Sequence, residues 1–167
     1  MSNVIKYAGQ ALVYGAIMAM LGYFATAPAY RTFPEGYARI TLTFSHGGKP
    51  EGGCRRRTAE EIAKLPPNMR RPFDCPRKRV PIFVQLQVDG STVYEASLEP
   101  AGVQGDGPAR VYKGIRVAAG PHKVTARLRD SERTEGFDYE REVDVVLKPG
   151  QHFVVQFKAE AGGFIFQ

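Results

Sequence analysis

Two cysteines, Cys54 and Cys75, have the clearest potential chemistry in this chain of 167 residues. They are the only cysteines in the sequence, and 20 residues lie between them. A structural zinc site uses pairs such as C-x-x-C with a nearby histidine, and neither cysteine has such a neighbour. We therefore predict no metal site and one disulfide, which in an oxidising compartment stabilises the loop it closes by about 3 kcal/mol.

The residues that usually carry catalysis show no catalytic spacing. His46, His122 and His152 are isolated, without an H-x-x-H or H-x-x-x-H pattern. The glycine-rich segment 102–107 is not followed by the lysine and the serine or threonine of a phosphate-binding loop. We predict that the protein is not an enzyme and holds no cofactor. A triad assembled from distant residues is the least favoured hypothesis.

The net charge of +6 is concentrated in one segment. Residues 54–79 contain nine Lys or Arg residues and three acids, so this segment alone carries +6 and the remaining 141 residues are balanced. It is either a docking patch for an acidic protein surface or anionic lipid headgroups, or a solvated insertion whose charges keep it soluble. The candidate docking residues are Arg55, Arg56, Arg57, Arg70, Arg71, Arg77, Lys78 and Arg79.

The N-terminal segment has the composition of a membrane helix. No charge occurs from Tyr7 to Tyr30, and these 24 residues are long enough to cross a hydrocarbon core of roughly 30 Å. The alternative is a cleaved signal peptide, because Ala27-Pro28-Ala29 matches an A-x-A cleavage site. We favour a transmembrane anchor at 1–30, followed by a linker at 31–37, because the apolar stretch continues beyond a usual signal core.

Small residues recur along one face of this predicted helix, at spacings of three and four. Such a face lets a second helix approach closely in lipid, where packing replaces the hydrophobic effect. Alanine and glycine are also common in membrane helices, so the pattern has a plainer explanation. We predict contact with a transmembrane helix of a larger membrane complex. The helix-packing residues are Ala8, Ala11, Gly15, Ala19, Gly22 and Thr26.

The orientation of the anchor follows from the cysteines. Only the amino terminus and Lys6 offer charge before the helix, and a long domain after it crosses the membrane regardless of its charge. A disulfide forms in an oxidising compartment. We therefore predict a single-pass protein of the bacterial inner membrane, with a cytoplasmic N-terminus and a periplasmic C-terminal domain. Nucleic acid is not expected as a partner there.

Residues 38–167 are predicted to form a mainly β domain. Hydrophobic residues alternate in short segments separated by Gly and Pro turns, which is typical of an antiparallel β-sandwich and, with seven or eight strands, of an immunoglobulin-like one. Residues 46–79 form a basic insertion with a short helix at 58–65, where Thr58 and Glu61 have the spacing of a capping box. The predicted strands cover 39–45, 80–88, 92–98, 111–117, 122–129, 139–147 and 153–157.

The C-terminal tail, residues 162–167, carries Phe164, Ile165 and Phe166 where a chain end is normally polar. Such a tail either adds a last strand to the sheet or inserts into a partner. We favour the last strand.

One anchor, a periplasmic immunoglobulin-like domain and no catalytic residues together resemble the layout of accessory subunits of bacterial respiratory complexes, the FixH/CcoH group of cbb-type cytochrome oxidases. The segment Gly120-Pro121-His122-Lys123-Val124 also resembles the G-x-H-x-V turn of carbohydrate-binding and carboxypeptidase-associated sandwich modules. The first resemblance implies a subunit that acts in assembly, stabilisation or docking within respiratory or photosynthetic electron transfer. The alternative is a stand-alone membrane-anchored binding module for an acidic protein, lipid or glycan.

Overall fold

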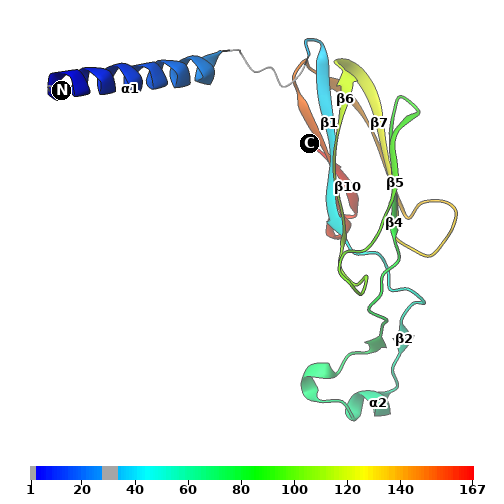
Figure 1. Ribbon diagram of the computed structural model, residues 1–167. Coiled ribbons are helices and arrows are strands. Elements are labelled where there is room, and N and C mark those ends of the chain that lie inside the picture. The colour runs from blue at the N-terminus through cyan, green and yellow to red at the C-terminus, as the bar shows by residue number, and fades with distance from the viewer. Residues whose placement is uncertain (1–2, 28–33) are drawn as a thin grey trace. The chain divides into compact units, whose positions relative to one another are not determined.

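The computed structural model describes residues 3–27 and 34–167, which divide into two compact units, Met1–Pro34 and Glu35–Gln167 (Figure 1). In the first unit, helix α1 (Asn3–Thr26) has no buried residue and is, by length and composition, able to cross a membrane. The ends of the predicted anchor at 1–30 and residues 31–33 of the predicted linker at 31–37 lie outside the described residues.

The second unit contains eight strands in two four-stranded sheets. One sheet has the order β10-β9-β1-β6 and the other has the order β5-β4-β7-β8. The predicted mainly β domain with antiparallel sheets is therefore confirmed, apart from one parallel pair, β1 with β9. The strands are β1 (Tyr37–His46), β4 (Ile82–Val88), β5 (Ser91–Leu98), β6 (Ala109–Ala118), β7 (Gly120–Arg129), β8 (Tyr139–Leu147), β9 (His152–Lys158) and β10 (Gly163–Phe166), with a 3₁₀ turn η2 (Ala159–Ala161) before β10.

The strand order differs from the predicted immunoglobulin order. In an immunoglobulin domain the first two strands share a sheet. Here the first long strand, β1, pairs with β6 and β9, whereas the next, β4, lies in the opposite sheet. An immunoglobulin-like arrangement therefore stays a prediction, because local alternation of hydrophobic residues reports burial, and not the sheet that a strand joins.

The core lies between the two sheets and is built by alternation along each strand. Ile40 and Leu42 of β1, Leu86 of β4, Leu128 of β7 and Val155 of β9 are completely buried. Burying each such side chain stabilises the fold by about 1.5–3 kcal/mol. All core residues come from the second unit, so its hydrophobic core is complete without α1.

A tight turn and the C-terminal tail complete this part of the fold. Asp89 and Gly90 both have positive φ, 52° and 78°, as the tight hairpin turn between β4 and β5 requires. The apolar tail forms β10, which pairs with β9 and buries Phe164 against Phe157 at a ring-centroid distance of 5.1 Å. The tail therefore completes the sheet.

The predicted insertion forms a small lobe between β1 and β4 (Figure 1). We call residues 54–79 the basic lobe. The predicted short helix is present as α2 (Ala59–Ala63), and Thr58 and Glu61 form the predicted capping box. The lobe also contains a short pairing of β3 (Phe73–Asp74) with β2 (Arg55–Arg56), and a 3₁₀ turn η1 (Pro67–Met69) lies between α2 and β3.

Candidate functional site

The basic lobe is closed covalently at its base. Cys54 and Cys75 form the predicted disulfide, with a Cα–Cα distance of 4.2 Å. Their neighbours Arg55 and Asp74 are register partners in the pairing of β2 with β3. Because a disulfide removes conformational freedom from the unfolded loop, it holds together a segment too small to have its own core.

Ion pairs inside the lobe use some of the predicted docking residues. Arg55 Nη1 lies 3.0 Å from Glu61 Oε1, and Arg57 Nη2 lies 2.9 Å from Asp74 Oδ1. The pKa of Glu61 is lowered, first by the hydrogen bond from the Thr58 backbone N–H and then by Arg55. These exposed pairs orient the lobe more than they stabilise it, because solvent screens them.

Three further predicted docking residues fasten the lobe to the sandwich. Arg77 Nη2 lies 2.7 Å from Asp106 Oδ2, and Lys78 Nζ lies 2.8 Å from Glu51 Oε2. The Arg79 backbone pairs with Pro50, and its N–H donates to the Gly105 carbonyl at 2.9 Å. Asp106 and Glu51 lie outside the lobe and offset two of its six positive charges. The docking role of these three residues stays a prediction.

The remaining predicted residues, Arg56, Arg70 and Arg71, are exposed on the lobe. Arg70 Nε donates to the Leu65 carbonyl at 3.1 Å. Within the described ranges 3–27 and 34–167, Arg56 and Arg71 have no carboxylate partner. Two large apolar side chains on the same lobe are exposed, Phe73 at 53% and Met69 at 56%. Phe73 is the register partner of Arg56 and, with Arg71, lines a shallow hollow of about 400 Å³.

We call Arg56, Arg71, Phe73 and Met69 the docking cluster, as the candidate contact residues of the lobe. Arginine, methionine and aromatic residues are the types enriched in the cores of protein–protein interfaces, whereas lysine and acidic residues are depleted there. The docking cluster has two guanidinium groups without a carboxylate partner among the described residues, and two exposed apolar side chains. These are the groups that a surface carrying carboxylates beside apolar residues would need.

A buried charge network fixes the loop that leads from β1 into the lobe. Asp130, at the end of β7, is 5% exposed, and its carboxylate lies 2.9 Å from His46 Nε2 and 3.4 Å from Lys49 Nζ. The neighbouring Asp138 accepts hydrogen bonds from the Asp130 N–H and the Ser131 hydroxyl. Burial opposes ionisation of Asp138, but these bonds, with Lys49 and Arg133, outweigh it and lower its pKa.

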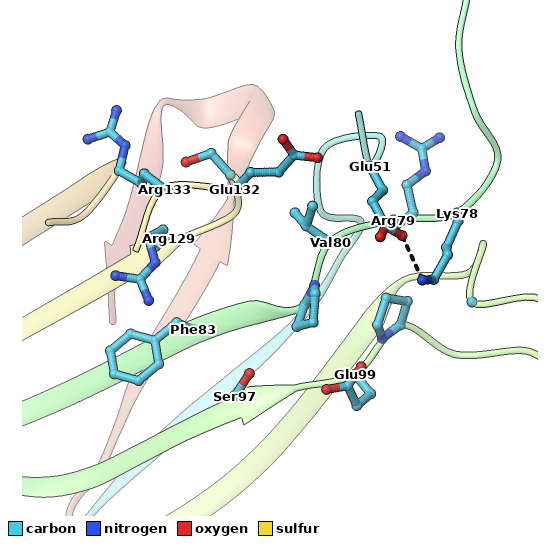
Figure 2. Close-up of a pocket in the computed structure, with 14 residues that line it drawn as sticks. Glu51, Lys78, Arg79, Val80, Phe83, Ser97, Glu99, Arg129, Glu132 and Arg133 are labelled. Carbon is cyan, nitrogen blue, oxygen red and sulfur yellow. Dashed lines mark ion pairs between the residues drawn. The ribbon is translucent and has the colours of Figure 1, made fainter. Parts of the chain in front are cut away.

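A cleft of about 610 Å³ lies where the lobe joins the sandwich (Figure 2). The Arg129 guanidinium lies over the Phe83 ring, 4.8 Å from its centroid, and donates to two loop carbonyls. Both signs of charge line the cleft, and Lys78 is already paired with Glu51. The lining residues are Glu51, Lys78, Arg79, Val80, Pro81, Phe83, Ser97, Glu99, Pro100, Gly105, Arg129, Ser131, Glu132 and Arg133.

The predicted helix-packing residues all lie on α1 and are exposed there. At Gly15 and Gly22, an added Cβ atom would meet nothing within 4 Å. Thr26 is turned back to its own helix, since its hydroxyl donates to the Gly22 carbonyl at 3.2 Å. The helix offers a surface of small side chains, and contact with another transmembrane helix stays a prediction.

Comparisons with family models, with curated proteins and with solved structures find no match to this chain. The candidate site therefore rests on its own geometry.

The sequence interpretation missed the acids that hold the root of the lobe. Glu51 pairs with Lys78, Asp106 pairs with Arg77, and Glu132 accepts from the Gly52 N–H. These partners come from three loops that are far apart in the sequence. No local spacing signals such contacts, because they depend on how the strands cross between the two sheets.

Proposed function

We propose that this protein is a non-catalytic, single-pass accessory subunit of a bacterial membrane complex, which docks an acidic partner protein through the docking cluster of its basic lobe. One observation carries the proposal: two arginines without a carboxylate partner among the described residues, Arg56 and Arg71, lie on the same disulfide-closed lobe as exposed apolar residues. A merely soluble insertion needs charge but has no need of an exposed Phe73 and Met69. The respiratory or photosynthetic setting rests on the architectural resemblance alone.

The direction of β1 favours a protein partner over lipid headgroups. The linker enters the domain at Tyr37, and the lobe leaves after His46, at the other end of the same strand. Ten residues of strand separate these two points by about 33 Å. The lobe therefore projects from the end of the domain opposite to the entry of the linker, where an acidic protein surface is the better candidate.

The anchor supports the proposal through its exposed surface. Helix α1 has no buried side chain, and apolar residues such as Leu12, at 74% exposure, need lipid or protein around them. In a bacterial inner membrane with a periplasmic domain, the face containing Gly15 and Ala19 would meet a helix of the complex.

Co-purification of the full chain from mildly solubilised native membranes tests this function. Arg56→Glu with Arg71→Glu should weaken recovery of the partner at low salt, because both guanidinium groups reverse sign at the contact. Lys148→Glu, a matched charge reversal in the exposed turn after β8, should leave recovery unchanged. If the parent protein and both variants recover the partner equally, the lobe does not dock it.

A second experiment tests the anchor separately. Gly15→Leu with Ala19→Leu fills the small face without an internal clash, since space around Gly15 is open. We expect the doubly substituted protein to stay in the membrane but to separate from its complex in mild detergent. Unchanged co-purification would show that this helix face is not a contact.

The second candidate function is a stand-alone membrane-anchored binding module for an acidic protein, lipid or glycan. The complete hydrophobic core of the Glu35–Gln167 unit favours it, because such a unit needs no subunit to bury its apolar residues. It predicts that the purified full chain binds a ligand without any co-purifying membrane protein. The co-purification experiment therefore distinguishes the two functions.

A further inference from the structure

Charge is separated between the two sheets of the sandwich, although the chain outside the basic lobe is balanced overall. The four strands β1, β6, β9 and β10 contain five Lys or Arg residues and no acidic residue. The four strands of the other sheet contain four of each sign, and many of these pair across strands, as Arg127 does with Glu140 at 2.8 Å. The strands of one sheet thus carry basic residues without acidic ones.

Register shows which side chains share that face. Ile40, Leu42 and their neighbours point into the core, so the alternate residues of each strand point outward. Tyr112, Thr43, Gln156 and Ile165 are consecutive register partners across β6, β1, β9 and β10. At about 4.8 Å between strands, this row extends over about 14 Å.

The row contains an exposed aromatic ring beside polar side chains that have no partner among the described residues. Tyr112 is 75% exposed. In the described parts of the chain, the side chains of Thr43, Ser45, Gln156 and Arg110 make no hydrogen bond or ion pair. Together with Tyr112 they line a shallow hollow of about 390 Å³. These donors and acceptors are available to a ligand.

Two arginines flank Tyr112 along β6. Arg110 and Arg116 project from the same face of β6, two positions before Tyr112 and four positions after it. Beside Arg116, the Arg39 guanidinium lies over Gly114, where an added Cβ atom would come within 2.4 Å of Arg39 Nε. Because Gly114 has no side chain, the Arg39 guanidinium can lie over β6 at this position.

We propose that this outer face binds an acidic polysaccharide, with a sugar ring stacked on Tyr112 and its carboxylates paired with Arg110 and Arg116. The C–H groups of a sugar ring carry partial positive charge and fit the negative face of an aromatic ring. Guanidinium groups match carboxylates in a bidentate geometry. Thr43 and Gln156 supply the neutral hydrogen bonds that sugar hydroxyls need.

An acidic polypeptide fits this surface less well. An extended peptide binds a sheet through the free backbone groups of an edge strand. β6, which carries Tyr112, is an edge strand to which a peptide could add, but Thr43 and Gln156 lie on β1 and β9, internal strands whose backbone groups are already paired on both sides. A ligand that contacts Tyr112 together with Thr43 and Gln156 is recognised by side chains on the face, which suits a flat sugar chain.

Binding of the full chain, in detergent micelles, to labelled polygalacturonate tests the proposal. We expect salt-sensitive binding that Tyr112→Ala weakens about tenfold, the upper range for loss of one aromatic contact. Tyr112→Phe keeps the ring and should bind like the parent protein. Arg110→Gln and Arg116→Gln should each weaken binding several-fold, whereas Lys148→Gln, in a turn away from this face, should not.

Two comparison ligands and one further variant make the outcome decisive. Neutral dextran should bind far more weakly than polygalacturonate, because it lacks carboxylates. If polyglutamate binds equally well, or if Tyr112→Ala has no effect, the face recognises charge alone and the proposal is overturned. It is also overturned if Arg56→Gln with Arg71→Gln abolishes binding, because the ligand then sits on the basic lobe. The proposal is also overturned if the protein does not bind polygalacturonate at low salt.

Discussion

His122 Nδ1 lies 2.7 Å from Asp89 Oδ2, and His122 Nε2 lies 2.8 Å from the Ala118 carbonyl oxygen. Both ring nitrogens thus face acceptors, which a doubly protonated imidazole satisfies by donating two hydrogen bonds. The hydrogen bond with Asp89 raises the pKa of His122 above its ordinary value of 6.5, against the effect of partial burial. This contact ties the β4–β5 turn to the start of β7.

The first prediction concerns pH. Because the folded-state pKa of His122 is raised, its contribution to stability is complete below the unfolded-state value of about 6.5 and is lost as pH rises through the folded value. Thermal unfolding of the full chain should therefore show a falling midpoint through this window, and His122→Gln should flatten it. An NMR titration of the imidazole that gave a pKa at or below 6.5 would contradict the prediction.

The second prediction concerns the buried carboxylate at the end of β7. Asp130→Asn removes the charge that faces His46 and Lys49, and should reduce the free energy of unfolding by about 2 kcal/mol, as for a hydrogen bond to a charged group. Urea denaturation measures this loss. Glu135→Gln, on the exposed loop that follows, is the matched control and should change stability little. A neutral effect of Asp130→Asn would mean that the network does not stabilise the domain.

Local features of the sequence predicted the elements of this fold well. Alternation of Ile40, Leu42 and Phe44 indicated β1 because the strand buries a single face, with a period of two. Asp89-Gly90 indicated a hairpin because both positions need positive φ, which few other residue pairs tolerate. Each signal is contained within a few residues.

Features that depend on distant residues could not be predicted in this way. Arg39 and His152 are register partners in the parallel pairing of β1 with β9, yet more than a hundred residues separate them in the chain. Likewise, Arg77 and Lys78 pair with Asp106 and Glu51, acids that lie in other loops and that no local spacing signals. Charge counts along the sequence describe composition, whereas a docking patch is defined by which charges remain unpaired.

The third prediction concerns the disulfide. Cys54→Ser with Cys75→Ser should release the basic lobe, which loses roughly 3 kcal/mol of loop-closure stabilisation. No residue of 54–79 belongs to the buried core, so the sandwich should stay folded. Hydrogen exchange followed by mass spectrometry should show loss of protection in the lobe while the strand amides, an internal control, stay protected. Global unfolding of the variant would show that the lobe supports the sandwich.

The fourth prediction concerns the C-terminal strand. Phe164 is 2% exposed and packs against Phe157, whereas its neighbour Ile165 points to the outer face of the same strand. Phe164→Ala should therefore lose about 3–5 kcal/mol of stability by removing a buried ring and leaving a cavity. Ile165→Ala also truncates a large apolar side chain, at the next residue but on the half-exposed side of the strand. It should reduce the free energy of unfolding by about 1 kcal/mol. Chemical denaturation of both variants compares the two faces directly. If both variants lose only a little stability, the tail does not close the core. Insertion of the tail into a partner would then be the better explanation of its apolar residues.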